Sequence, residues 1–358
     1  MIDPLDQYGV AKVDDSDPVN YPYGKGTPWE KALINDILGF FQSVAAKAGF
    51  IPNLNPESVG NPQVLQGIVD VANIKNEMIN PAFKIWQEGD VINVPAGVST
   101  YTADQYFCLS TGADTTAAKS TDDLGQVCHS LTGVGSSTSV SFGQRFPADN
   151  VPRNTTELTF AFRVLMATAE ELTWSIDEAN APDDFAGVTT IESGTFGVLS
   201  VGWQYLKVTI PVTSAQIANG YQAVLVLPNG IQAANVVKHS EMQLNKGFIS
   251  PAFQANKKGQ DLSECQDFLF LNEGYTFSGY VSAGQNLANP IQWPRTMRAT
   301  PVLSVVAIGT TGNVASLVVV LPTMDGCVVS ITPTVGDAMV SYGAIDPTNL
   351  KIRADARL

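Results

Sequence analysis

The sequence has little charge and few of the residues that most often perform chemistry. Charged residues make up 15% of the 358-residue chain, and there are only two histidines and four cysteines. The 34 acidic residues outnumber the 20 basic ones, which gives a formal net charge of −14. Because nucleic acids and anionic membrane surfaces are bound by clustered Lys and Arg, this balance argues against both as partners.

Long apolar runs are missing as well. The nearest candidate, residues 303–321, is interrupted by Gly309-Thr-Thr-Gly-Asn313, which predicts a turn between two strands rather than a membrane-spanning helix. The N-terminal Met1-Ile-Asp-Pro-Leu-Asp6 has neither a basic region nor an apolar stretch. We therefore expect neither membrane insertion nor a secretory signal.

The cysteines do not form a recognisable metal or disulfide pattern. No CxxC pair occurs among Cys108, Cys128, Cys265 and Cys327. Scattered spacing of this kind predicts reduced thiols that pack as small apolar side chains. A bridge between Cys108 and Cys128 remains an alternative, because their separation suits a hairpin.

Sequence signatures of catalysis are absent. The chain contains no HExxH, GxSxG or P-loop motif. His239 lies beside Lys238 in a predicted strand and is expected at the surface. His129 follows Cys128, but neighbours on a strand point to opposite faces, so a catalytic Cys–His pair is not expected.

Three pairs of adjacent acidic residues are candidates for the carboxylates of a glycan-cleaving enzyme. Such an enzyme needs two carboxylates that face a cleft, whereas neighbours in a polar stretch are typical of a solvated surface. We expect the second role for all three pairs: Asp122-Asp123, Glu170-Glu171 and Asp183-Asp184.

Alternation of polar and apolar residues dominates the middle of the chain. It is clear in Leu158-Thr-Phe-Ala-Phe-Arg-Val164, Leu172-Thr-Trp-Ser-Ile176 and residues 203–210. Short strands punctuated by Gly, Pro, Asn and Ser predict a jelly-roll β-sandwich over residues 79–255. The fold class is therefore mainly β.

The last third of the chain predicts a second all-β unit, a tip domain over residues 256–358. The strands expected there share apolar alternation and turn signals at their ends. They cover Asp267–Asn272, Tyr275–Ser282, Leu287–Trp293, Val302–Ile308, Val314–Val320, Gly326–Thr332 and Met339–Ile345.

The first 78 residues follow a different pattern. Residues 1–27 show no periodicity and predict an extended arm that orders on a partner. Residues 28–78 predict two short helices whose apolar stripes are too exposed for a lone chain, which favours a homotrimeric stalk. The residues expected at the trimer interface are Trp29, Leu33, Ile37, Phe40, Phe41, Val44, Leu65 and Ile68.

Two short patterns bracket the predicted sandwich. They are Asn80-Pro-Ala-Phe-Lys-Ile-Trp-Gln-Glu-Gly-Asp90 with Tyr101-Thr-Ala-Asp-Gln-Tyr106, and residues 235–253 with Glu264-Cys-Gln-Asp-Phe-Leu-Phe270. Together they resemble the opening and closing strands of the carbohydrate-binding-module-like β-sandwich of bacteriophage tail fibers. In that family the opening reads Asn-Pro-x-Phe-x-Ile-Trp-Gln-x-Gly.

Further segments carry the same resemblance in the same order along the chain. The stalk pieces Trp29-Glu-Lys-Ala-Leu33 and Ala48-Gly-Phe-Ile-Pro52 are similar to tail-fiber N-terminal helices. Gly202-Trp-Gln-Tyr-Leu-Lys-Val-Thr-Ile-Pro211 is similar to a strand of the sandwich. Pro294-Arg-Thr-Met-Arg-Ala-Thr-Pro301 is similar to a piece of tail-fiber tips.

The resemblance implies a structural virion appendage rather than an enzyme. Residues 1–27 would dock on a phage tail or adaptor protein, and the β units would contact a host surface glycan or outer-membrane protein. The chain would be made in the host cytoplasm and be located in the virion tail. Two alternatives are a capsid-attached head fiber or decoration protein and a receptor-degrading tailspike; a bacterial carbohydrate-binding module is a weaker one.

Sugar contact requires exposed aromatic rings, because the apolar face of a pyranose packs against them. The candidates for receptor contact are Trp174, Tyr275, Tyr280 and Trp293. Trp86 and Trp203 are instead expected in the core. No cofactor is expected; sandwiches of the resembled kind often hold a structural calcium, for which Asp90 and Asp104 are the candidate ligands.

Overall fold

The computed structural model describes residues 75–152, 155–248, 250–271, 277–281, 285–307, 311–312, 314–333, 338–342 and 351–357. The expected arm and the eight expected trimer-interface residues lie outside the described residues. Within them, the strands pair antiparallel and form sheets, which confirms a mainly β fold. No described helix is long and apolar enough to cross a membrane.

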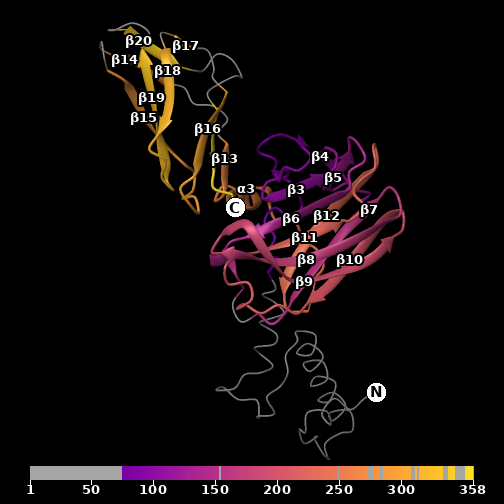
Figure 1. The fold of residues 1–358 in the computed structure, drawn as a ribbon. Coiled ribbons are helices and arrows are strands. Elements are labelled where there is room, and N and C mark those ends of the chain that lie inside the picture. The colour runs from indigo at the N-terminus through magenta and orange to yellow at the C-terminus, as the bar shows by residue number, and fades with distance from the viewer. Residues whose placement is uncertain are drawn as a thin grey trace, which may run out of the picture.

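Two six-stranded sheets form the expected sandwich (Figure 1). The first sheet has, in order across it, β1 (Val91–Val94), β4 (Thr115–Thr121), β5 (Val127–Gly133), β12 (Val236–Lys246), β7 (Leu158–Met166) and β10 (Gly202–Ile210). The second has β2 (Thr100–Tyr101), β3 (Tyr106–Thr111), β6 (Ser139–Phe146), β11 (Tyr221–Leu227), β8 (Glu170–Ala181) and β9 (Asp184–Leu199). A 3₁₀ turn, Ala148–Asn150, follows β6.

Strand alternation explains how the sandwich closes. In β7, Phe160, Phe162 and Val164 point into the core, while Arg163 between them points away from it. Since successive side chains of a strand face opposite sides, one face of each sheet is apolar and meets the other sheet. In β12 this alternation is shifted by a bulge between Ser240 and Gln243.

The C-terminal residues form three smaller sheets of three strands each (Figure 1). They are β13 (Leu269–Leu271), β21 (Lys351–Asp355) and β16 (Val302–Ala307); β14 (Phe277–Val281), β20 (Ala338–Tyr342) and β17 (Thr311–Gly312); and β15 (Leu287–Gln292), β19 (Gly326–Pro333) and β18 (Val314–Val320). We refer to these sheets as the C-terminal sheets. Each of the seven expected strands overlaps one of them.

Three elements of the C-terminal region were not expected from the sequence. A helix, α3 (Lys258–Cys265), precedes the first strand. The two-residue β17 lies inside the segment that was expected to be a turn, and β21 follows the last expected strand. The expected boundary between residues 255 and 256 falls between β12 and α3, and the division into domains stays a prediction.

A small apolar cluster joins the two parts of the chain. Ile79 and Ile85 precede the sandwich strands, and they pack with Cys265 and Phe268 at the end of α3. Leu262 of the same helix packs against this cluster. The C-terminal sheets are therefore held against the side of the sandwich on which the chain enters it.

Candidate functional site

The opening motif begins with a side chain that fixes a turn. Asn80 is buried, and its Nδ2 donates to the carbonyl oxygens of Ile85 at 2.9 Å and Asp104 at 3.3 Å. Its Oδ1 accepts the backbone N–H of Ile85 at 3.1 Å. Asn80 also has a φ of 54°, a conformation that Asn tolerates better than most residues. The first residue of the motif therefore has a structural role.

An aromatic column follows from the same motif. Trp86 is buried as expected and stacks on His129 with ring centroids 5.5 Å apart. His129 stacks on Phe142 at 4.4 Å, and Phe142 stacks on His239 at 4.6 Å. The expectation that His239 lies at the surface was wrong, because β12 places it on the inward face of its sheet.

Both histidines of this column are held neutral. Burial lowers the pKa of His239 to about 3. Burial and the neighbouring His239 hold the pKa of His129 well below its ordinary value. The Nε2 of His129 lies 3.0 Å from the hydroxyl of Thr102, while Nδ1 of each ring is buried without a hydrogen-bond partner in the described part of the chain. The column packs the core and presents no base to a substrate.

Gln87 connects the sandwich to the C-terminal sheets. Its Nε2 donates to the carbonyl oxygen of Leu269 at 2.9 Å, and its Oε1 accepts the N–H of Leu271 at 3.3 Å. On the sandwich side, Nε2 donates to Oδ2 of Asp104 at 2.5 Å, and the backbone N–H of Gln87 donates to Oδ1 at 2.9 Å. One side chain thus pairs with β13 as a neighbouring strand would.

The two calcium candidates both have protein partners. Gln87 occupies both carboxylate oxygens of Asp104, and burial raises the pKa of Asp104 in spite of these hydrogen bonds. Asp90 is exposed and pairs with Lys119 at 3.3 Å. No group of three or more His, Cys, Asp or Glu side chains among the described residues has the arrangement of a metal site.

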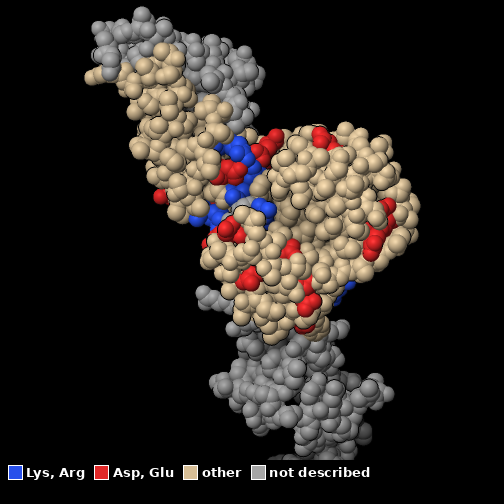
Figure 2. Space-filling model, viewed as in Figure 1, with Lys and Arg blue, Asp and Glu red and all other residues tan. Residues whose placement is uncertain are grey.

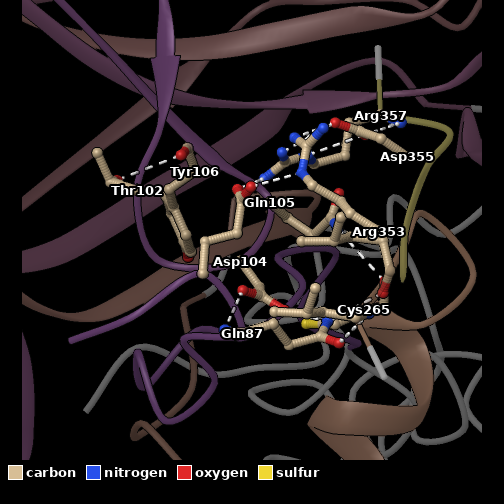
Figure 3. A network of polar contacts seen from close by, with 12 residues as sticks. Gln87, Thr102, Asp104, Gln105, Tyr106, Cys265, Arg353, Asp355 and Arg357 are labelled. Atoms are coloured by element: carbon tan, nitrogen blue, oxygen red, sulfur yellow. Dashed lines mark hydrogen bonds and ion pairs between the residues drawn. The ribbon is translucent and has the colours of Figure 1, made fainter. Parts of the chain in front are cut away.

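A chain of charges extends the connection that Gln87 begins (Figure 3). Glu88 pairs with Arg353 at 2.6 Å and with Arg357 at 2.7 Å. Asp355 pairs with Arg357 at 2.9 Å and also with Arg353. The guanidinium group of Arg357 lies 4.2 Å from the ring centroid of Tyr101. We call these contacts, together with those of Gln87, the junction network.

The network stabilises the charged form of Asp355. Burial opposes ionisation of this carboxyl group, but hydrogen bonds from Arg357 and the positive charges of Arg357 and Arg353 hold its pKa below the ordinary value. Burial likewise opposes the charge on Arg357, yet hydrogen bonds and charge interactions with Asp355 and Glu88 raise its pKa. Asp355 and Arg357 therefore each stabilise the charged form of the other.

Sequence reasoning missed the strand that supplies these arginines. In β21 and the residues after it, Ile352, Ala354 and Ala356 are buried in the C-terminal core. The intervening Arg353, Asp355 and Arg357 face the sandwich and form the charge pairs. This strict alternation from Lys351 to the end of the chain was the signal that could have revealed both the strand and the network.

A cleft of about 540 Å³ opens beside the junction network. Figure 2 shows acidic and basic side chains gathered where the C-terminal sheets meet the sandwich. The sandwich lines the cleft with Arg145 and residues 183–186, and the C-terminal region lines it with residues 298–300, Val302 and residues 355–357. Arg298, from the segment that resembles fiber tips, pairs with Asp183 at 2.5 Å across the cleft.

Aromatic rings support Arg145 and Arg298 of the cleft, as Tyr101 supports Arg357. The guanidinium of Arg145 lies 4.7 Å from the ring centroid of Phe107 and 5.3 Å from that of Phe185. That of Arg298 lies 5.6 Å from the ring centroid of Phe268. Cation–π contacts of this kind hold a guanidinium in one orientation, so the cleft is lined by positioned charges.

The residues predicted to contact a receptor do not gather in one site. Trp174 is only 9% exposed and lies in the sandwich core, where its ring contacts the backbone at Gly194. Trp293 is 6% exposed, and its Nε1 donates to the carbonyl oxygen of Thr323 at 3.2 Å. Neither ring has a face open to a sugar. Tyr275 lies outside the described residues, as does the side chain of Tyr280 in β14.

The exposed aromatic ring of the sandwich is one that sequence reasoning did not select. Tyr205 in β10 is 52% exposed, and Trp203 of the same strand face is partly exposed rather than in the core as expected. Arg163 lies 4.9 Å from the ring centroid of Trp203. Alternation in a sequence does not say which face of a strand is exposed, so Tyr205 could be assigned to the outward face only after the buried face was known.

Two of the acidic pairs contain residues that form ion pairs with arginines. Asp122 and Asp123 pair with Arg163 at 3.3 and 2.7 Å, and Asp183 pairs with Arg298. The expectation of a solvated loop was therefore wrong for Asp122, whose side chain is buried. Glu170-Glu171 begin β8 rather than lying in a loop. All four cysteines are buried and free, as expected, and the alternative bridge is not formed.

Comparison with known proteins gives weak structural matches only. No protein-family model and no curated protein matches the chain. A sugar-binding protein of Bacteroides thetaiotaomicron is 16% identical over 48% of this chain and 100% of its own, with a TM-score of 0.34. The xylan-binding domain CBM22-1 of Paenibacillus barcinonensis Xyn10C is 12% identical over 45% and 97%, with a TM-score of 0.30.

A viral protein is also among the matches. The enzymatically active domain of tailspike protein 4 of bacteriophage CBA120 is 9% identical over 48% of this chain and 21% of its own, with a TM-score of 0.31. Carbohydrate-binding modules with β-sandwich folds are thus among the structural neighbours. At these scores the function has to be argued from the residues of this chain.

Proposed function

We propose that this chain is the non-enzymatic tail fiber of a bacteriophage, and that it adsorbs the particle to a host surface glycan. The observation that supports this proposal is the position of the motif residues, which lie where the sandwich contacts the C-terminal sheets. Gln87 and Glu88 of the opening motif clamp β13 and β21 onto the sandwich, and Arg298 of the tip motif adds an ion pair across the cleft. Three of the segments that resemble tail fibers, the opening motif, residues 264–270 and residues 294–301, thus meet at one junction.

A stiff junction suits an adhesin. A fiber has to transmit force from the particle to the receptor-binding end, and a network of hydrogen bonds and ion pairs across the joint resists bending there. In the proposed assembly, residues 1–27 dock on a tail or adaptor protein and residues 28–78 trimerise. Three copies then bind the host together, so individually weak sites gain avidity through high effective concentration.

The same contacts favour adhesion over cleavage. A glycan-cleaving pair needs one carboxyl group that carries a proton and a second that faces it across the bond. In the cleft, Asp183 and Asp355 are instead paired with arginines, and the pKa of Asp355 is lowered rather than raised. These ion pairs keep the surface of the cleft rigid, and their polar atoms can form hydrogen bonds with a ligand.

Oligomeric state tests the stalk. Light scattering on the purified full chain should give a mass of three copies, because the stripe that ends with Leu65 and Ile68 needs partners. A monomer with a folded N-terminal region would remove the trimer from the proposal.

Adsorption tests the biological role. Preincubating host cells with the purified chain should reduce adsorption of particles that carry it, and labelled antibody should decorate the tail. Label on the capsid would point to a head fiber, and shortening of host polysaccharide by the chain would point to a tailspike. Unchanged adsorption over a saturating range of protein would overturn the adhesin.

A further inference from the structure

We propose that the cleft beside the junction network binds a neutral saccharide of one or two rings. The inference rests on the proposed function, because it names the site at which the adhesin contacts its glycan. Its volume of about 540 Å³ falls inside the range of roughly 300–1,000 Å³ that is usual for small-ligand pockets. A longer segment of glycan would extend beyond it into solvent.

The polar groups of the cleft suit hydroxyl groups. A sugar hydroxyl both donates and accepts, so it fits best where guanidinium donors lie beside carboxylate acceptors. Arg298 and Asp183 form such a pair at 2.5 Å. The Nε of Arg298 is buried and has no hydrogen-bond partner among the described residues. No hydrogen bond therefore offsets the free-energy cost of removing this donor from water.

Acceptors are also available at the open side. Asp184 is exposed, and its Oδ1 accepts the backbone N–H of Ala186 at 3.0 Å. That contact holds an exposed carboxylate in place at the cleft. Thr300 on the opposite wall is exposed and adds a hydroxyl group. Donors and acceptors therefore approach from both the sandwich and the C-terminal sheets.

Charge balance favours a neutral ligand over an anionic one. The lining contains three arginines and three aspartates. At Arg298 and Arg357 a phosphate or a uronate would compete with Asp183 and Asp355, and each of these pairs is made at 2.9 Å or less. A neutral sugar can instead bridge the existing pairs.

One wall supplies apolar surface for the C–H face of a ring. Val302 is 74% exposed. It lies directly opposite Asp355 in the β16–β21 pairing, so both side chains project from the same face of the sheet into the cleft. An apolar side chain next to a carboxylate is the combination that a pyranose ring uses.

Filling the cleft tests the site without removing any of its contacts. Val302→Trp adds bulk at an exposed strand position, and Val318→Trp does the same in β18, where Val318 is 50% exposed and does not line the cleft. Asp184→Ala removes one exposed acceptor. Each variant is made in the full chain, and its thermal unfolding midpoint is measured beside that of the wild type.

Binding is measured by ligand-observed NMR against a panel of neutral mono- and disaccharides, with glucuronate and inorganic phosphate as anionic comparators. We expect the wild type to bind at least one neutral sugar. Val302→Trp should weaken that binding by about tenfold or more, because the indole occupies the volume that the ligand needs and this loss outweighs any stacking on its ring. Asp184→Ala should weaken binding less, and Val318→Trp should leave it within about twofold.

Three outcomes would overturn the site: no neutral sugar binds, an anionic comparator binds best, or Val302→Trp binds as well as Val318→Trp. Host-cell adsorption by the same proteins separates this inference from the proposed function. Adsorption by Val302→Trp at wild-type strength would reject the cleft while leaving the adhesin intact. Absence of adsorption by the wild type would reject the adhesin itself.

Discussion

The sandwich and the C-terminal sheets differ in how their residues are held. In the sandwich, two six-stranded sheets enclose one continuous core of aromatic and aliphatic side chains. The C-terminal sheets have three strands each, and their described core is smaller and centres on Trp293 and Met297. Because small units bury a smaller share of their surface, the C-terminal sheets have more to gain from docking on a neighbour. The junction network supplies that docking.

Removing an aromatic ring from the centre of the sandwich should have the largest effect. Phe142→Ala takes away the ring that stacks on Tyr106, His129 and His239. We expect a loss of about 3–5 kcal/mol in the free energy of unfolding, because the cavity cannot collapse between two sheets. Denaturant titration would measure it. Hydrogen exchange should report loss of protection in both six-stranded sheets of the sandwich, and loss confined to β6 would argue against a continuous core.

A matched cavity in the C-terminal core should stay local. Met297→Ala deletes a fully buried side chain. We expect a cost of about 2–4 kcal/mol for the C-terminal sheets. Peptide-resolved hydrogen exchange should show faster exchange in β19 and β21 with β7 unchanged. Equal deprotection of β7 would mean that the two parts unfold as one cooperative unit.

The junction network should rank next. Glu88→Gln removes one of the two carboxylates that Arg353 and Arg357 share, and Asp355 remains as the other. A fully buried pair that loses one partner costs about 3–5 kcal/mol, and because Glu88 is partly exposed we expect about 2–3 kcal/mol. Hydrogen exchange would measure the loss of protection in β13 and β21, with the sandwich strands as internal reference. Unchanged exchange in both strands would show that docking does not depend on these charges.

Acid should weaken the sandwich through its histidines. The unfolded chain protonates His239 near its ordinary pKa of about 6.5, whereas burial lowers the pKa to about 3 in the folded state. Stability from this residue is therefore complete above pH 6.5 and is lost as pH falls towards 3. At pH 5 the loss is about 2 kcal/mol.

The matched variant for that test is His239→Phe, which keeps an aromatic ring beside Phe142. Subtracting its stability curve from that of the wild type removes the contributions of carboxyl groups whose pKa is raised, such as Asp104 and Glu77. The wild type should lose more stability than the variant between pH 7 and pH 5. Parallel curves would mean that His239 is protonated equally in both states.

The smallest effect should come from an exposed ion pair of the sandwich. Asp90→Asn breaks the 3.3 Å pair with Lys119, in which Asp90 is mostly exposed. Exposed pairs contribute about 0–1 kcal/mol, so we expect a change within about 0.5 kcal/mol by denaturant titration. A loss as large as that of Glu88→Gln would remove the distinction between surface pairs and the junction network.

Much of the fold followed from local pattern. Alternation located β7, β8 and β10 in the sandwich and all seven expected strands near the C-terminus. The burial of Trp86 and the reduced state of the cysteines also agreed with expectation. These features could be predicted because they depend on local sequence: period-2 alternation indicates a strand in any sandwich, and small apolar side chains pack in any core.

The site was less accessible to sequence reasoning. Trp174 and Tyr205 both lie in alternating strands, yet the first is buried and the second is half exposed. Alternation shows that a strand has two faces, but it does not say which face another element will cover. The cleft combines Arg145, Asp183, Arg298 and Arg357 from distant segments, and their meeting depends on how α3 and β13 dock.

The sequence by itself determined that this chain is mainly β, that its net charge is strongly negative, and that its middle closes into a sandwich. Only the tertiary structure decided that Glu88 meets Arg353, across 265 positions of the chain, and that Val302 and Asp355 share one wall of a cleft. The reason is physical: strand periodicity is set by neighbours along the backbone, whereas docking depends on which apolar surfaces remain uncovered after each sheet has formed.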